Sequence, residues 1–180
     1  SLEVGLGDGS YALYICSALK NQNLKDNYHI VIAPNQKRLY DNSGIDNLQE
    51  LDYKNLKFIK KPSFLYLPKL LEKFTGKTKF RKRIFLPDYD RIDLCFINKM
   101  DTFDRLLTDF MYCDLLLKIG GYIILENLET DAMKELKNYL DSNYTHYNRV
   151  DSEYKAFLIY NKTKDDERNW DFHINYQKKS

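Results

Sequence analysis

A glycine-rich turn near the start of the chain, Glu3–Ser10 (EVGLGDGS), constrains the fold more than any other segment. The apolar run Leu2–Leu6 predicts a short buried strand before it, and residues 10–20 show helical spacing of apolar side chains after it. Glycine permits positive φ and close approach of a ligand to the backbone, and a helix N-terminus adds unpaired N–H groups. The strand–turn–helix context therefore predicts a nucleotide-like cofactor site. A lone G-x-G-x-G also occurs in turns that use glycine for packing alone.

Strands and helices are predicted to alternate along the rest of the chain. Further strands are expected at His29–Ala33, Leu56–Ile59, Arg91–Ile97, Tyr122–Leu125, Tyr144–Val150 and Tyr154–Tyr160. Helices are expected at Ser43–Leu51, Ser63–Phe74, Thr102–Lys118 and Leu128–Leu140, with Gly120-Gly121 as the C-cap signal of the third. Phe103, Leu106, Leu107, Phe110, Leu115 and Leu117 form the apolar stripe of that helix. This order predicts an α/β sandwich with a mainly parallel sheet. We expect one domain over residues 1–162 and a polar tail or edge extension over 163–180.

Composition excludes several classes of protein. The 180 residues include 28 Lys+Arg and 26 Asp+Glu, so the net charge of +2 excludes a globally basic nucleic-acid coat. No apolar run is long enough for a membrane span, and no signal peptide opens the chain. Cys16, Cys95 and Cys113 show no C-x-x-C spacing, which argues against a zinc site and predicts a reducing, cytoplasmic environment. His29 and His146 lie outside the motifs and are predicted to be structural.

One stretch, residues 69–83, is locally basic. It could attract the phosphates of a sugar nucleotide or of a nucleic acid. A solvated lysine-rich loop is the alternative, and it is favoured because charge runs are usually of that kind. Lysine, which outnumbers arginine in the chain, is the poorer reader of base edges. The basic residues are Lys69, Lys73, Lys77, Lys79, Arg81, Lys82 and Arg83, with Phe74 and Phe80 among them.

The glycine turn resembles motif I of the class I S-adenosylmethionine-dependent methyltransferases, E/D-h-G-x-G-x-G. It differs from the dinucleotide fingerprint, whose third glycine falls one residue later, and it lacks the lysine of a P-loop. A second block, residues 91–101 (RIDLCFINKMD) with residues 116–127 (LLKIGGYIILEN), is similar to a pattern of small-molecule and sugar O-methyltransferases. The resemblance covers residues 2–160. It implies a Rossmann-like class I methyltransferase fold, with a mostly parallel seven-stranded sheet and a terminal antiparallel hairpin.

The resemblance also implies S-adenosylmethionine as the cofactor, lying across the carboxyl ends of the first strands. The glycines would line its methionine part, with Glu3 near the amino-acid end and Asn98 on the methionine side. Ala33 and Pro34 would lie near the ribose, and Ser63 near the adenine edge. The implied cofactor-binding residues are Glu3, Gly5, Gly7, Asp8, Gly9, Ser10, Ala33, Pro34, Ser63 and Asn98.

The sequence departs from the family pattern at three places. Ala33 stands where family members often carry an acidic residue that binds the ribose. Asn98, Glu126 and Asn127 offer one carboxylate and two amides, a poor set for Mg²⁺, so no divalent metal is expected. Asp101 is the candidate catalytic residue, as a general base towards a substrate hydroxyl. Its alternative role, an N-cap of the following helix, is favoured.

Three functions remain open at this point. The resemblance implies an enzyme that methylates a hydroxyl group of a small molecule, such as a sugar. The departures motivate a methyltransferase-fold binding or scaffold domain without catalysis, and the 69–83 segment motivates a nucleic-acid methyltransferase. Family members carry helices before the first strand, so the resemblance also implies that N-terminal helices are missing from this sequence.

Overall fold

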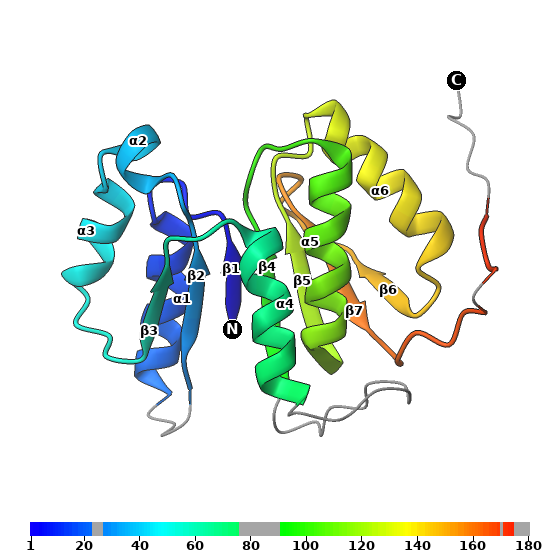
Figure 1. Cartoon of the computed structure of the whole chain (residues 1–180), viewed down its shortest axis with the longest axis horizontal. Coiled ribbons are helices and arrows are strands. Elements are labelled where there is room, and N and C mark those ends of the chain that lie inside the picture. Colours follow the sequence, from blue (N-terminus) through cyan, green and yellow to red (C-terminus); the bar gives the residue numbers. More distant parts are fainter. Residues whose placement is uncertain (23–26, 76–90, 170, 175–180) are drawn as a thin grey trace.

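The computed structural model describes residues 1–22, 27–75, 91–169 and 171–174, and it contains one seven-stranded sheet among six helices (Figure 1). The strands are β1 (Leu2–Val4), β2 (His29–Ile32), β3 (Leu56–Ile59), β4 (Ile92–Ile97), β5 (Leu117–Leu125), β6 (Tyr147–Val150) and β7 (Leu158–Lys162). The helices are α1 (Ser10–Asn21), α2 (Gln36–Tyr40), α3 (Ser43–Gln49), α4 (Ser63–Thr75), α5 (Phe103–Leu116) and α6 (Asp131–Asn143).

The strand order is β3-β2-β1-β4-β5-β7-β6. The strands β1 to β5 are parallel to one another, whereas β7 pairs antiparallel with both β5 and β6. The predicted parallel sheet with a terminal antiparallel hairpin is confirmed. The strands β2 and β3 follow β1 on one side of the sheet, and β4 lies next to β1 on the other side, so the order of the strands reverses at β1. In open α/β sheets, the carboxyl edge at such a reversal is where ligands bind.

The helices cover the two faces of the sheet and enclose two apolar clusters. On the face turned toward the viewer in Figure 1, α4, α5 and α6 pack over a large cluster that includes Leu67 and Phe110. On the opposite face, α1 and α3 enclose a smaller cluster around Cys16 and Val31. Because successive strand residues point to opposite faces, Ile30 and Ile32 join the large cluster while Val31 joins the small one.

The junction between α5 and β5 differs from the prediction. The helix ends at Leu116, and Leu117 already has extended backbone angles, φ −77° and ψ 135°. Gly120 and Gly121 therefore lie inside β5 and do not cap the helix. Leu115, predicted to belong to the apolar stripe of this helix, is 42% exposed. The sequence signal was misleading because a Gly-Gly pair after a helix usually marks its end.

Two further boundaries were missed. The short helix α2 follows Pro34 and Asn35, where no element was predicted, and β7 begins at Leu158, four residues later than predicted. No helix among the described residues is long and apolar enough to cross a membrane. Of the basic 69–83 segment, Lys69 and Lys73 lie on α4, whereas Lys77, Lys79, Arg81, Lys82 and Arg83 lie outside the described residues.

Candidate functional site

A cavity of about 330 Å³ lies at the carboxyl ends of β1, β2 and β4. Its walls come from the turn after β1, the segment joining β2 to α2, the start of α4 and the loop between β4 and α5. This is the edge at which the order of the strands reverses, and the volume is that of a small-molecule site. Seven of the residues predicted from the sequence line it: Gly5, Gly7, Ala33, Pro34, Ser63, Asn98 and Asp101.

The other four predicted residues, Glu3, Asp8, Gly9 and Ser10, do not line this cavity. Glu3 lies within β1, is fully buried, and its Oε2 is 3.0 Å from Nε2 of His29. Asp8 is exposed and accepts a hydrogen bond from the backbone N–H of Ser10 through Oδ1, at 3.0 Å. Gly9 packs against Gly44 of α3. These residues shape the turn and the sheet beneath it.

The three glycines of the turn serve different purposes. All have positive φ, at +90° for Gly5, +57° for Gly7 and +86° for Gly9. A Cβ on Gly5 would lie 1.8 Å from the carbonyl oxygen of Asn98, and one on Gly9 would lie 2.6 Å from that of Gly44. A Cβ on Gly7 would meet only the Asn98 amide nitrogen, at 3.6 Å. Gly5 and Gly9 are therefore required for packing, while Gly7 borders open space at the cavity wall.

Gln36 at the start of α2 holds this turn in place. Its side chain is 4% exposed, and its Nε2 donates a hydrogen bond to the carbonyl of Gly7 at 2.9 Å. Its Oε1 has no hydrogen-bond partner within the described part of the chain. No local sequence pattern indicates this interaction, because it joins residues that are 29 positions apart.

The centre of the cavity wall is a lysine that the sequence motifs did not single out. Lys99 follows β4, and its Nζ lies 2.6 Å from Oδ2 of Asp109 and 2.9 Å from Oδ2 of Asp101. The same nitrogen donates to Oγ of Ser63 at 3.4 Å. Lys99 thus links the β4–α5 loop to both α5 and α4. Asp109 is 1% exposed and could have been noticed as an acidic residue on a helix face between apolar neighbours.

The electrostatics of this cluster keep Lys99 and Asp101 charged. Burial opposes the charge on Lys99, but the two aspartates outweigh it and raise the lysine pKa. Burial would likewise raise the pKa of Asp101, yet the bonds from Lys99 and from the Thr102 N–H lower it. Burial raises the pKa of Asp109 despite its ion pair. Asp101 is therefore an ionised hydrogen-bond acceptor of low basicity.

The prediction that Asp101 caps α5 is wrong. The N-cap residue is Thr102, one position later, with extended backbone angles. Oδ1 of Asp101 accepts the Thr102 N–H at 2.9 Å, and it lies 3.5 Å from Nη1 of Arg105. The other carboxylate oxygen of Asp101 pairs with Lys99, and the residue lines the cavity.

The polar residues after β4 and β5 bond to one another. The Nδ2 of Asn127 donates to Oδ1 of Asn98 at 3.3 Å, and the Tyr11 hydroxyl donates to Oε1 of Glu126. This bond to Glu126 raises the pKa of Tyr11 to about 12. Asn127 has a positive φ of 61°. Asn98, Glu126 and Asn127 thus belong to a hydrogen-bond network that joins α1, β4 and β5.

A second cluster of titratable residues lies at the far end of α5. Asp114, His146 and Asp166 each place one potential ligand atom within 4.8 Å of the others. Lys162 already lies 3.2 Å from Oδ1 of Asp114, and Arg168 pairs with Asp166. Asp114 and Asp166 thus each also have a cationic side-chain partner, and the cluster joins the C-terminal segment to α5.

Comparison with known proteins gives structural neighbours but no sequence relatives. No family model and no curated protein matches the sequence. The O-methyltransferase NovP is 12% identical, with a TM-score of 0.62 over 91% of this chain and 71% of its own. A proposed O-methyltransferase from Klebsiella pneumoniae is 11% identical, with a TM-score of 0.63 over 91% and 72%. TrmN from Thermus thermophilus is 16% identical, with a TM-score of 0.57 over 89% of this chain and 43% of that protein.

Proposed function

Because this chain has the class I methyltransferase fold, we propose that it binds S-adenosylmethionine in the cavity at β1, β2 and β4 and transfers a methyl group to a hydroxyl. The observation that carries the proposal is the position of the cavity. It lies where the strand order reverses, and it is walled by a glycine turn whose Gly7 leaves the backbone accessible.

The residues at the wall fit such a cofactor. Its adenosine part would lie against apolar lining residues such as Leu39 and Pro62. The Asn98 amide and the Asp101 carboxylate supply polar and negative groups for its amino-acid part and its positive sulfonium. Ala33 offers no carboxylate to the ribose, so we expect an affinity lower by the 1–3 kcal/mol that a charged hydrogen bond contributes, roughly.

The chemistry depends on alignment more than on a strong base. Bound S-adenosylmethionine supplies an electrophilic methyl group, and its displacement requires the acceptor oxygen to lie in line with the leaving sulfur. Asp101, ionised and held by Lys99, would accept a hydrogen bond from the acceptor hydroxyl and so orient its oxygen. As the C–O bond forms and the C–S bond breaks, the hydroxyl proton would pass to this carboxylate and then to water. Lys99 is a positioning residue, because its contacts hold Asp101 and Ser63 relative to each other.

Calorimetry with S-adenosylmethionine tests the proposal. We expect saturable binding that Asp101→Asn weakens several-fold, whereas the matched change Asp104→Asn, on the exposed first turn of α5, leaves the affinity unchanged. Absence of detectable binding at millimolar ligand would overturn it. Binding without transfer of a labelled methyl group to any acceptor from a small-molecule or RNA fraction would instead favour a binding or scaffold domain.

A further inference from the structure

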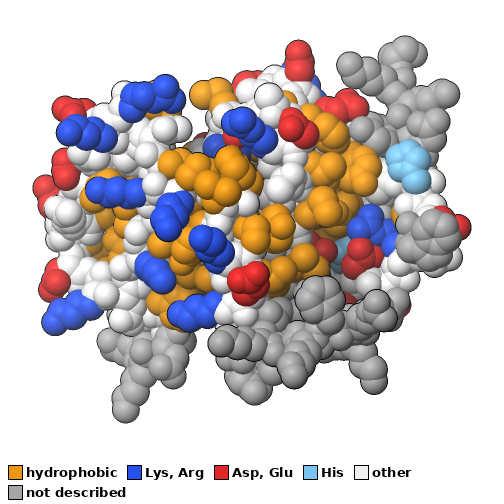
Figure 2. Space-filling view, in the orientation of Figure 1, with side chains coloured by type: hydrophobic (Ala, Val, Ile, Leu, Met, Phe, Trp, Pro, Cys, Tyr) orange, Lys and Arg blue, Asp and Glu red, His pale blue; other side chains and the backbone are white. Residues whose placement is uncertain are grey.

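Six exposed lysines form one surface over β3 and α4, which we call the basic face. Figure 2 shows basic side chains gathered over this part of the molecule. Two of the lysines lie on α4, and four lie on or beside β3. Only Asp52 and Glu72 are acidic between residues 51 and 75. The basic face consists of Lys54, Lys57, Lys60, Lys61, Lys69 and Lys73.

Within the described part of the chain, the lysines of the basic face differ from six other lysines that make ion pairs. Lys99, Lys118, Lys134, Lys137, Lys162 and Lys164 each lie within 4.0 Å of a carboxylate. Among the residues that the structure describes, no carboxylate lies that close to any lysine of the basic face. The net charge of +2 of the whole chain therefore hides a local positive field.

The basic face joins two cavities. A second cavity, of about 470 Å³, lies between the start of β3 and the end of α4, and Lys54, Lys57 and Lys73 border it. At the other end, Lys60 and Lys61 directly precede Pro62, Ser63 and Phe64, which line the cofactor cavity. The four residues of β3 alone span about 13 Å, so the lysines follow an extended path that ends at the candidate site.

We propose that the basic face binds the phosphate backbone of single-stranded nucleic acid and leads one unpaired nucleotide into the cofactor cavity. That this nucleotide is the methyl acceptor rests on the proposed function, whereas binding of the strand does not. Lysine ammonium groups act as point charges on phosphates and read no sequence, so affinity without strong sequence preference is expected.

The mouth of the cavity favours a single strand over a duplex. Phe64 is 48% exposed and Tyr40 is 40% exposed, and both line the cavity. Exposed aromatic rings beside a basic groove are platforms on which unpaired bases stack. A base held in a duplex cannot enter a cavity of this size without leaving the stack.

Fluorescence anisotropy with a labelled 20-nucleotide RNA of mixed sequence, in the absence of S-adenosylmethionine, tests the proposal on the full chain. The variant Lys57→Gln/Lys60→Gln/Lys61→Gln/Lys69→Gln should weaken binding by about tenfold or more. It should also reduce the dependence of binding on salt. The slope of the logarithm of the binding constant against the logarithm of the salt concentration should become shallower by roughly 0.7 for each phosphate that the protein no longer neutralises. The control Lys118→Gln/Lys134→Gln/Lys155→Gln/Lys164→Gln removes the same charge elsewhere and should bind like the wild type. Phe64→Ala should weaken binding about fivefold with an unchanged salt slope.

Three outcomes would overturn the proposal. They are no binding of RNA by the wild type at low salt, equal reductions of affinity in the basic-face and control variants, and a preference for duplex of the same length. Binding to phosphatidylserine vesicles that is abolished in the basic-face variant, with no RNA binding, would assign the face to membranes instead. Calorimetry with S-adenosylmethionine is independent of all these readouts, so failure of RNA binding and failure of the proposed function are distinguishable.

Discussion

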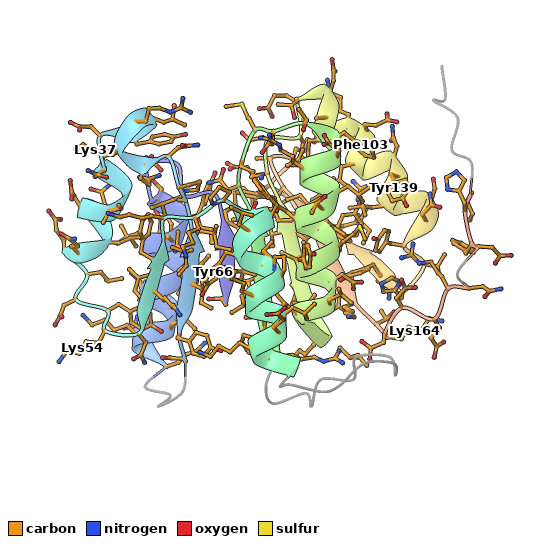
Figure 3. All side chains as sticks on the ribbon, viewed as in Figure 1. Lys37, Lys54, Tyr66, Phe103, Tyr139 and Lys164 are labelled. Carbon is orange, nitrogen blue, oxygen red and sulfur yellow. The ribbon has the colours of Figure 1, made fainter. Side chains whose placement is uncertain are left out.

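Helix α5 carries two aspartates that each meet a lysine, and the two pairs have different roles. Near its start, Asp109 pairs with Lys99 at 2.6 Å, and Asp101 completes that cluster. Near its end, Asp114 pairs with Lys162 at 3.2 Å, and Asp165 lies equally close to the same lysine. In both cases one lysine lies between two carboxylates. In Figure 3, Phe103 is labelled at the upper end of α5, and Lys164 is labelled at the lower right, on the segment that follows β7.

The difference lies in the surroundings of each lysine. The Lys99 side chain is 19% exposed and borders a cavity, whereas that of Lys162 is 3% exposed. Nζ of Lys162 also donates to the carbonyls of Asp114 and Leu117, at 2.8 and 3.3 Å, where α5 passes directly into β5. The cluster around Lys99 is accessible to a ligand. The cluster around Lys162 instead stabilises the junction between the end of α5 and the sheet. Residue types alone do not distinguish a site from a structural clamp.

The largest expected effect comes from breaking the clamp. Burial opposes the charge of Asp114, but His146, Lys162 and Tyr147 together lower its pKa, and Lys162→Met removes the lysine cation from this buried carboxylate. An unpaired buried charge costs about 3–5 kcal/mol, so urea denaturation should show a loss of unfolding free energy of that size. Affinity for S-adenosylmethionine, measured on the folded fraction, should stay the same. A loss below about 1 kcal/mol would contradict the structural role.

The glycine turn offers a second contrast between packing and binding. Gly5→Ala places a Cβ against the Asn98 carbonyl at positive φ and should cost about 3 kcal/mol or more in unfolding free energy. Gly7→Ala meets open space and should cost about 1 kcal/mol, while lowering cofactor affinity more than its stability loss explains. Thermal unfolding and calorimetry on both variants measure this. Equal stability losses would show that the two positions are not distinguished by packing.

A pH titration tests the buried Glu3–His29 pair, which lies in the sheet outside both clusters. Burial raises the pKa of Glu3 well above its ordinary value and lowers the pKa of His29 to about 3, so the folded pair holds one proton, on Glu3. The unfolded pair holds two protons below pH of about 4.5, one between about 4.5 and 6.5, and none above. The contribution of this pair to the free energy of unfolding therefore decreases as the pH falls below about 4.5. It also decreases as the pH rises above about 6.5.

The variant Glu3→Gln should remove the alkaline part of that dependence. Above pH of about 6.5, the unfolding free energy of the wild type should fall relative to that of the variant in urea denaturation, because the buried Glu3 carboxyl keeps its proton to a higher pH than in the unfolded chain. The control His173→Gln, in an exposed segment, should keep the wild-type profile. Parallel curves for wild type and Glu3→Gln would show that Glu3 is ionised in the folded protein.

Lys99→Met should have the smallest effect on stability. Asp109 already has a raised pKa because it is buried, so it can take up a proton when the lysine is removed, and water in the cavity can reach Asp101. We expect a loss of about 1 kcal/mol in unfolding free energy, together with a loss of methyl transfer that is much larger than the several-fold loss of cofactor affinity. A loss of unfolding free energy equal to that of Lys162→Met would show that both clusters mainly stabilise the fold.

Local patterns in the sequence were sufficient for most of the fold. The apolar periodicity located β3 at its observed boundaries and most other elements to within a few residues, and the glycine turn placed a cavity at the end of β1. The Gly120-Gly121 signal failed because the pair lies at an irregularity within β5, between the pairings of Leu117 and Tyr122 with β4. The cap predicted at Asp101 failed because a neighbouring lysine competed for the carboxylate.

The sequence by itself determined the order of strands and helices, and thus the edge of the sheet where a ligand can bind, because these depend on spacing along the chain. The tertiary structure alone decided which charged residues meet. Lys99 and Asp109 are joined through the packing of α5 on β4, and the lysines of the basic face are set apart from carboxylates by the placement of β3 beside α4. Such contacts depend on distances across the fold, which spacing in one sequence does not encode.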